Sequence, residues 1–187
     1  MSSNTASRLF VALAATAAFA GAAQMVHAQV MVGGAPMLAS KEIIHNAGNS
    51  KHHTTLVAAL KAARLGETLN GAGPFTVFAP TNEAFAALPA GTVDTLLKPE
   101  NKGTLTTVLT YHVVPGKWDA AAISKMITDG KGQAMIKTVA GGSLKATAQG
   151  GKVMLTDEKG GMATVTIADV YQSNGVIHVI DKVLLPK

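Results

Sequence analysis

The apolar positions of this chain follow one period in its first half and another in its second. Before residue 130 they recur every three or four positions, as at Leu56, Val57 and Leu60, which is typical of amphipathic helices. After residue 134 apolar and polar residues alternate, as in Lys152 to Thr156, which is typical of strands with one exposed face. Helices followed by strands predict an α+β domain.

The helical half contains residues that favour helix ends. We expect Ser40 to cap a helix that starts at Lys41, and Thr92 to cap a helix that Pro99 ends. Asn46 to His53 is polar and predicts a loop. The pattern then predicts helices at 55–65, 92–97, 101–111 and 119–127.

Residues 75–89 predict a strand that turns sharply into a short helix. In the strand, Phe75 and Val77 fall on one face and Phe78 on the other, and Pro80 ends it. Thr81 is placed to cap the helix, whose Phe85 faces inward. We therefore expect this stretch to join two layers of the core.

Glycine pairs separate the strands of the second half, which we expect at 136–139, 144–147, 152–156 and 164–168. Asn174-Gly175 predicts a two-residue hairpin between Val170–Ser173 and Val176–Leu184. The last strand begins with Val176 to Ile180, which is almost continuously apolar. That composition favours a central strand covered on both faces.

The first 28 residues differ from the rest of the chain. Arg8 precedes an alanine-rich apolar run, and Val26-His27-Ala28 fits a small-x-small cleavage site, so we predict a signal peptide over 1–28. A retained membrane anchor is the alternative, which the shortness of the run disfavours. Residues 29–40 are small and glycine-containing and predict a flexible lead-in. Residues 41–187 then form a single domain.

Composition excludes several classes of protein. The 187 residues include no cysteine, which excludes disulfides, a lipoprotein anchor and thiol catalysis. The formal charge is +5, or +4 without the first 28 residues, and it comes mostly from scattered lysines. The cations are not clustered, and aromatic residues make up only 4% of the chain. The chain therefore lacks the basic patch and the aromatic stacking platform that are typical of nucleic-acid binding. No second long apolar run predicts a transmembrane segment in the mature chain.

Histidines are the main candidates for chemistry. His45, His52 and His53 lie close together, but a loop fixes no metal geometry and no carboxylate lies among them. We therefore predict a solvated loop and no metal site. Neither a Gly-x-Ser-x-Gly elbow nor a phosphate-binding loop occurs, so we predict no catalytic residues and no cofactor.

Three segments of the chain resemble the signature segments of the fasciclin (FAS1) family. They are Thr-Val-Phe-Ala-Pro-Thr-Asn-Glu-Ala-Phe at 76–85, Tyr-His-Val-Val-Pro-Gly at 111–116, and Asn-Gly-Val-Ile-His-Val-Ile-Asp-Lys-Val-Leu-Leu-Pro at 174–186. The resemblance covers roughly Lys41 to Pro186. It implies the FAS1 fold, a β-sheet wedge or sandwich in the C-terminal half with several short helices packed on it.

The same resemblance implies an exported, single-domain bacterial binding module that is periplasmic or lies at the cell surface. Its implied role is cell adhesion or contact with a cell surface or extracellular matrix, through protein or glycan partners. The chain contains no Asp-Ile and no Arg-Gly-Asp, so the integrin-binding motifs of animal relatives do not carry over. A periplasmic carrier or envelope factor for an apolar or polysaccharide ligand is the alternative, and a hydrolase is a distant third.

The resemblance also points to Tyr111 and His112 as candidate adhesion contacts. The alternative for His112 is a buried, hydrogen-bonded side chain that holds the junction between a helix and a strand. We favour this structural role for His112, and more firmly for His178, which lies inside an apolar strand.

Overall fold

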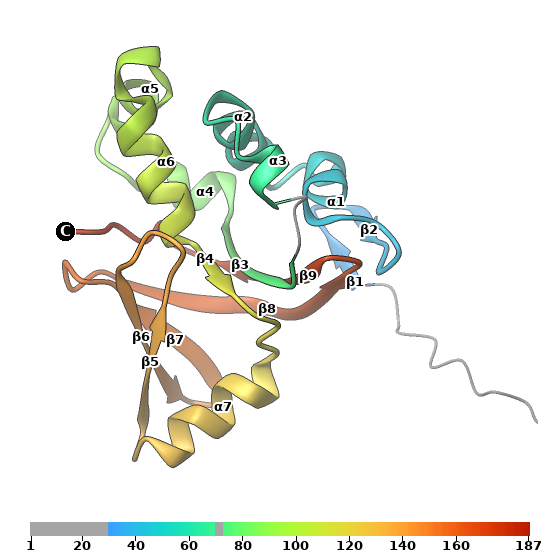
Figure 1. The fold of residues 1–187 in the computed structure, drawn as a ribbon, viewed down its shortest axis with the longest axis vertical. Helices are drawn as coiled ribbons and strands as arrows, with labels where there is room; N and C mark the ends of the chain where they lie inside the picture. Colours follow the sequence, from blue (N-terminus) through green and yellow to red (C-terminus); the bar gives the residue numbers. More distant parts are fainter. Residues whose placement is uncertain (1–29, 70–72) are drawn as a thin grey trace, which may run out of the picture.

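A seven-stranded sheet organises the chain, with the strand order β4-β3-β9-β8-β7-β6-β5. The computed structural model describes residues 30–69 and 73–187, so the predicted signal peptide lies outside the described residues (Figure 1). The strands are β3 (Phe75–Pro80), β4 (Val113–Pro115), β5 (Gln133–Lys137), β6 (Ser143–Gln149), β7 (Lys152–Thr156), β8 (Met162–Gln172) and β9 (Gly175–Ile180).

Helices come mostly before the main sheet in the chain, which confirms the α+β class. They are α1 (Ile43–Asn49), α2 (Thr54–Ala62), α3 (Gly66–Leu69), α4 (Asn82–Ala86), α5 (Thr92–Leu97), the 3-10 turn η1 (Pro99–Asn101), α6 (Lys102–Tyr111) and α7 (Ala120–Asp129). In Figure 1, α1 to α6 lie on one side of the long strand β8, and α7 lies on the other side with β5 to β7.

Strands β3 and β9, the second and third strands of the sheet, pair in parallel, from Phe75 opposite Gly175 to Pro80 opposite Ile180. Every residue of β9 is buried, as its apolar run predicts. Gly175 allows the close approach of the two strands, because a Cβ atom there would overlap the carbonyl oxygen of Phe75.

The two faces of β3 and β9 contribute to two hydrophobic cores. The helical core lies under α1 to α6 and includes Val77, Ala79, Phe85, Leu109, Ile177 and Val179. The sheet core lies under α7 and includes Phe78, Ile123, Ile127, Ile136, Leu144, Leu155 and Ile180. The strand at 75–80 therefore supplies side chains to both cores, as its alternation predicts.

The structure differs from the sequence prediction at the N-terminal edge. Within the predicted flexible lead-in, β1 (Val30–Val32) and β2 (Ala35–Met37) form an antiparallel hairpin. Val32 and Met37 are buried in the helical core. Burial of these two side chains stabilises a segment whose small residues and glycines suggested a coil.

Several predicted boundaries also shift. The first helix starts at Ile43 with Glu42 at its N-cap, so Ser40 is not the cap, and Gly91 rather than Thr92 precedes α5. Thr81 caps α4 as predicted, and its side-chain oxygen accepts a hydrogen bond from the Ala84 backbone N–H. The two strands predicted at 164–173 form one strand, β8, with register shifts between Val165 and Val170.

Candidate functional site

Tyr111 and His112 lie where α6 ends and the chain turns into β4. Both side chains are buried, with 0% and 2% of their surface exposed. Each bonds to segments that are distant in sequence, so the two residues form an internal junction rather than an exposed contact.

The phenol of Tyr111 connects two turns between strands. Its hydroxyl donates to the carbonyl oxygen of Ser143 at 2.9 Å and accepts from the backbone N–H of Glu158 at 3.2 Å. Burial raises the pKa of Tyr111 above its ordinary value, so the phenol keeps the proton that it donates. Gly142 lies against the ring, because a Cβ there would be 2.6 Å from Cε2 of Tyr111.

The imidazole of His112 connects α6 to the C-terminal segment. Nε2 accepts from the backbone N–H of Leu184 at 3.0 Å, so Nδ1 carries the proton and donates to the carbonyl oxygen of Val108 at 2.7 Å. Burial lowers the pKa of His112 to about 4. The ring is therefore neutral at pH 7, and both of its nitrogens have partners.

Asp157 completes this junction from the turn between β7 and β8. One carboxylate oxygen accepts from the backbone N–H groups of Lys159 and Gly161, and the other accepts from Leu185 at 2.9 Å. The carboxylate therefore shapes its own turn and binds the C-terminal segment next to the residue that His112 holds. Three side chains, Tyr111, His112 and Asp157, fix the positions of three separate segments.

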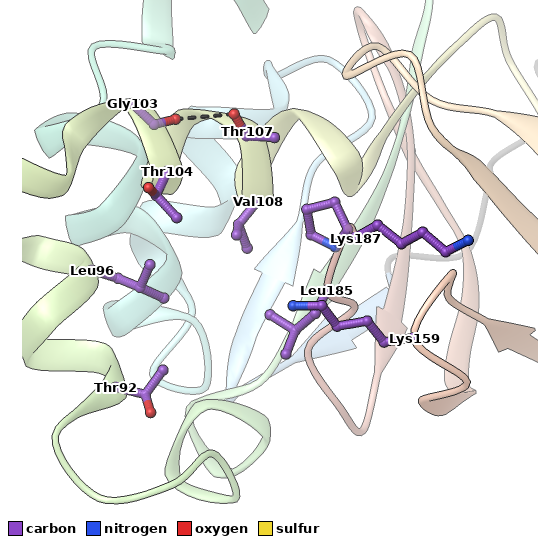
Figure 2. Close-up of a pocket in the computed structure, with 10 residues that line it drawn as sticks. Thr92, Leu96, Gly103, Thr104, Thr107, Val108, Lys159, Leu185 and Lys187 are labelled. Atoms are coloured by element: carbon purple, nitrogen blue, oxygen red, sulfur yellow. Dashed lines mark hydrogen bonds between the residues drawn. The ribbon is translucent and has the colours of Figure 1, made fainter.

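An open groove of about 580 Å³ lies beside this junction, between α5, α6 and the C-terminal segment (Figure 2). Figure 2 shows Thr92 and Leu96 on one side of it, and Lys159 and Lys187 on the other. The residues that line the groove are Thr92, Leu96, Gly103, Thr104, Thr107, Val108, Lys159, Leu185, Pro186 and Lys187.

Three of the segments that line the groove, α6, the β7–β8 turn and the C-terminal segment, are tied to the junction. Val108 lines the groove and accepts the hydrogen bond from His112. Leu185 lines it and donates to Asp157, whose other oxygen accepts from Lys159. The junction therefore holds three of the segments that surround the groove, although none of its three side chains lines it.

The chemistry of the groove is that of a binding surface. Its threonine hydroxyls donate and accept hydrogen bonds, its two lysines carry positive charge, and Leu96, Val108 and Leu185 provide apolar contact. The residues that line the groove include no histidine, cysteine or carboxylate side chain.

The remaining histidines have separate structural environments. His178 Nε2 donates to the carbonyl oxygen of Trp118 at 2.7 Å, and Nδ1 accepts from the backbone N–H of Asp169 at 3.3 Å. Burial lowers the pKa of His178. These bonds agree with the structural role predicted for this histidine.

The prediction of a solvated loop from Asn46 to His53 is wrong at both ends. Residues 46–49 belong to α1, and His53 is buried with its Nδ1 atom 2.9 Å from the Ser50 hydroxyl. The polar composition gave no sign of this, because His53 is buried by packing against the hairpin β1–β2 and the main sheet, which are distant in sequence. Within 30–69 and 73–187, no three His, Cys, Asp or Glu side chains converge as metal ligands.

Comparisons with known proteins identify the family. The Fasciclin domain model matches residues 51–186. Protein sll1483 of Synechocystis is 52% identical over 144 residues, covering 77% of this chain and 73% of that protein. Immunogenic protein MPB70 of Mycobacterium bovis is 40% identical over 145 residues, covering 75% of this chain and 66% of that protein.

Relatives in animals match one part of longer proteins. Transforming growth factor-beta-induced protein ig-h3 of Sus scrofa is 38% identical over 131 residues, which is 70% of this chain and 17% of that protein. The solved structure of a FAS1 domain pair from the insect cell adhesion molecule Fasciclin I has a TM-score of 0.67 at 18% identity. The match covers 78% of this chain and 51% of that one. This likeness confirms the predicted FAS1 fold, and with the sequence matches it shows that the chain belongs to the Fasciclin domain family.

Proposed function

We propose that this protein is an exported binding module that mediates cell adhesion or contact with a cell surface through the groove. The observation that carries the proposal is that α6, the β7–β8 turn and the C-terminal segment, which supply most of the groove lining, are tied to the junction of Tyr111, His112 and Asp157. A surface whose shape is fixed before binding loses less entropy when a partner binds. Fasciclin I, which shares the fold, is described as a cell adhesion molecule.

In this proposal Tyr111 and His112 act by positioning the groove. Both are buried, so a partner would reach the segments that they hold rather than the side chains themselves. His112→Ala would then lower thermal stability and adhesion together. Loss of adhesion with an unchanged melting temperature would contradict the positioning role and favour direct contact.

The lining of the groove favours a hydrogen-bonding partner, either a protein or a glycan. Thr92, Thr104 and Thr107 offer hydroxyls, and Lys159 and Lys187 favour a partner with acidic groups at one end. The proposed location is the periplasm or the cell surface, in keeping with the signal peptide predicted at residues 1–28. Within the described residues, no helix is both long and apolar enough to span a membrane.

The carrier alternative needs an enclosed apolar cavity. The small apolar cavity between the hairpin β1–β2, α1 and the sheet has a volume of only about 10 Å³. It is lined by Val32, Met37, Ala47, His53, Ala79, Val170 and Ile177. This volume is that of about one water molecule, so the cavity does not favour a carrier of apolar ligands.

The proposal is tested by filling the groove. The host strain that lacks the protein is scored for attachment and aggregation, and residues 29–187 are then added back as wild type or as Thr107→Arg. We expect wild type to restore attachment and Thr107→Arg to fail, because the arginine occupies the groove. Equal restoration by both proteins would contradict the proposal that the groove binds the partner. If deletion of the protein left attachment unchanged, the adhesive function would be contradicted.

Thr128→Arg is the matched control. Thr107 and Thr128 are both exposed helical threonines, and each donates to the backbone carbonyl oxygen four residues earlier, at 3.0 Å. Thr128 lies on α7, away from the groove. The control therefore adds the same charge and volume to a similar helical site and should leave attachment unchanged.

A further inference from the structure

A second surface lies on the half of the sheet formed by β5 to β8. The inner face of these strands packs on α7 and contributes Ile136, Leu144, Ala146 and Leu155 to the sheet core. Their opposite face, here called the outer face, bears no helix, as Figure 1 shows for β5 to β7. Its residues are Gln133, Met135, Lys137, Ser143, Lys145, Thr147, Gln149, Lys152, Met154, Thr156, Met162 and Thr164.

The outer face is cationic. Lys137, Lys145 and Lys152 are exposed, and none of them forms a salt bridge with another described residue. No acidic residue lies among the twelve. Two carboxylates at the margins bind backbone N–H groups, Glu158 that of Ser143 and Asp181 that of Thr164. The face therefore presents three lysines that no ion pair within the described residues engages.

Large apolar side chains interrupt this cationic surface. The strand registers align Met135, Lys145, Thr156 and Met162 in one row across β5 to β8. Met135 and Met162 are 64% and 48% exposed and stand at the two ends of the row. From the usual spacing of strands, these ends are about 14 Å apart.

We propose that the outer face docks on the surface of an anionic phospholipid membrane. Lysines attract any polyanion, but exposed methionine side chains gain nothing from a hydrated polymer, whereas they enter the headgroup and acyl boundary of a bilayer. A second copy of the chain is disfavoured, because face-to-face packing would bring lysines together. The absence of aromatic side chains from the face disfavours stacked nucleic-acid bases.

The test measures sedimentation with vesicles, using residues 29–187, which contain every described helix and strand and both cores. We expect binding to vesicles of phosphatidylglycerol and phosphatidylcholine, little binding to phosphatidylcholine alone, and weaker binding in high salt. Removing one lysine should weaken binding about fivefold, so Lys137→Gln with Lys145→Gln and Lys152→Gln should weaken it roughly a hundredfold.

The matched control removes three exposed lysines from the helical side, with Lys61→Gln, Lys98→Gln and Lys102→Gln. It has the same net charge as the outer-face variant and should bind vesicles far better. Equal binding by the two triple variants, or equal binding of wild type to both kinds of vesicle, would overturn the proposal.

A variant without the exposed methionines distinguishes a membrane from a soluble polyanion as the partner. Met135→Ser with Met162→Ser keeps all charges and should weaken vesicle binding about tenfold, because the apolar contact is lost. Unchanged vesicle binding by this variant would overturn the proposal that the face docks on a membrane and would favour a hydrated acidic polymer as the partner. Thr107→Arg should bind vesicles as wild type does, so failure here and failure of the groove proposal are distinguishable.

Discussion

The two ends of the main sheet are covered differently. At β3 and β9, helices α1 to α6 cover one face and the sheet core covers the other, so every residue of β9 is buried. At β5 to β7, only the inner face is covered, and the outer face carries lysine, threonine and methionine. The comparison shows that one sheet serves as the interior of the molecule at one end and as a surface at the other.

The largest effects are expected when one large side chain is removed from each hydrophobic core. Phe85→Ala in the helical core and Phe78→Ala in the sheet core should each lower the free energy of unfolding by about 3–5 kcal/mol. Both side chains are buried, and Phe78 also stacks on the His178 ring at 5.6 Å. Urea unfolding measures the loss. A loss below about 1 kcal/mol for either variant would contradict the placement of that side chain in its core.

Acid should weaken the buried centre of the molecule. His53 and His112 have pKa values lowered by burial to about 4, against about 6.5 when unfolded. Between these values the unfolded chain binds protons that the folded chain does not. Each neutral histidine therefore makes its full contribution to the free energy of unfolding above pH 6.5. This contribution is lost as the pH falls toward 4, by up to about 3 kcal/mol for each histidine.

Urea unfolding at a series of pH values checks this expectation. In His112→Gln the residue no longer titrates, so the loss of stability between pH 6.5 and 4 should be less steep than in wild type, because only His53 and His178 still contribute to it. An identical slope in His112→Gln and wild type would contradict a lowered pKa at His112.

A smaller effect is expected where the groove junction meets the sheet. Gly142→Ala would place a Cβ 2.6 Å from the buried Tyr111 ring, and displacing that ring should cost about 1–3 kcal/mol. Gly48 lies on α1 with no atom within 4 Å of an added Cβ, so Gly48→Ala should stabilise by up to about 1 kcal/mol. Thermal melts of the two variants check this. If both melting temperatures shifted in the same direction, the close contact at Gly142 would be contradicted.

The smallest effect is expected on the outer face itself. Met135→Ala removes a side chain that is 64% exposed, so stability should change by less than about 0.5 kcal/mol. Ile136→Ala, one residue along the same strand, removes a buried side chain and should cost about 2–5 kcal/mol. Similar losses for the two neighbours would show that the outer face is covered in solution.

The site was only partly predictable. The sequence motif drew attention to Tyr111 and His112, and an apolar neighbourhood predicted that His112 and His178 would be hydrogen-bonded. The motif carried no sign of the groove, because the lining residues Thr92, Lys159 and Leu185 come from three distant segments. Asp157 was also missed, since a single aspartate in a glycine-rich turn looks like turn chemistry and nothing more.

Local sequence signals were enough to predict several helices and strands. The periods of the apolar residues, the cap at Thr81 and the apolar run of β9 depend on neighbours within a few positions, so they survive in the structure with shifts of a few residues at their ends. Three features could be seen only in the folded chain: the parallel pairing of β3 with β9, the burial of His53 and the hairpin β1–β2. These features depend on contacts between segments far apart in the chain, whose free energy no local pattern carries.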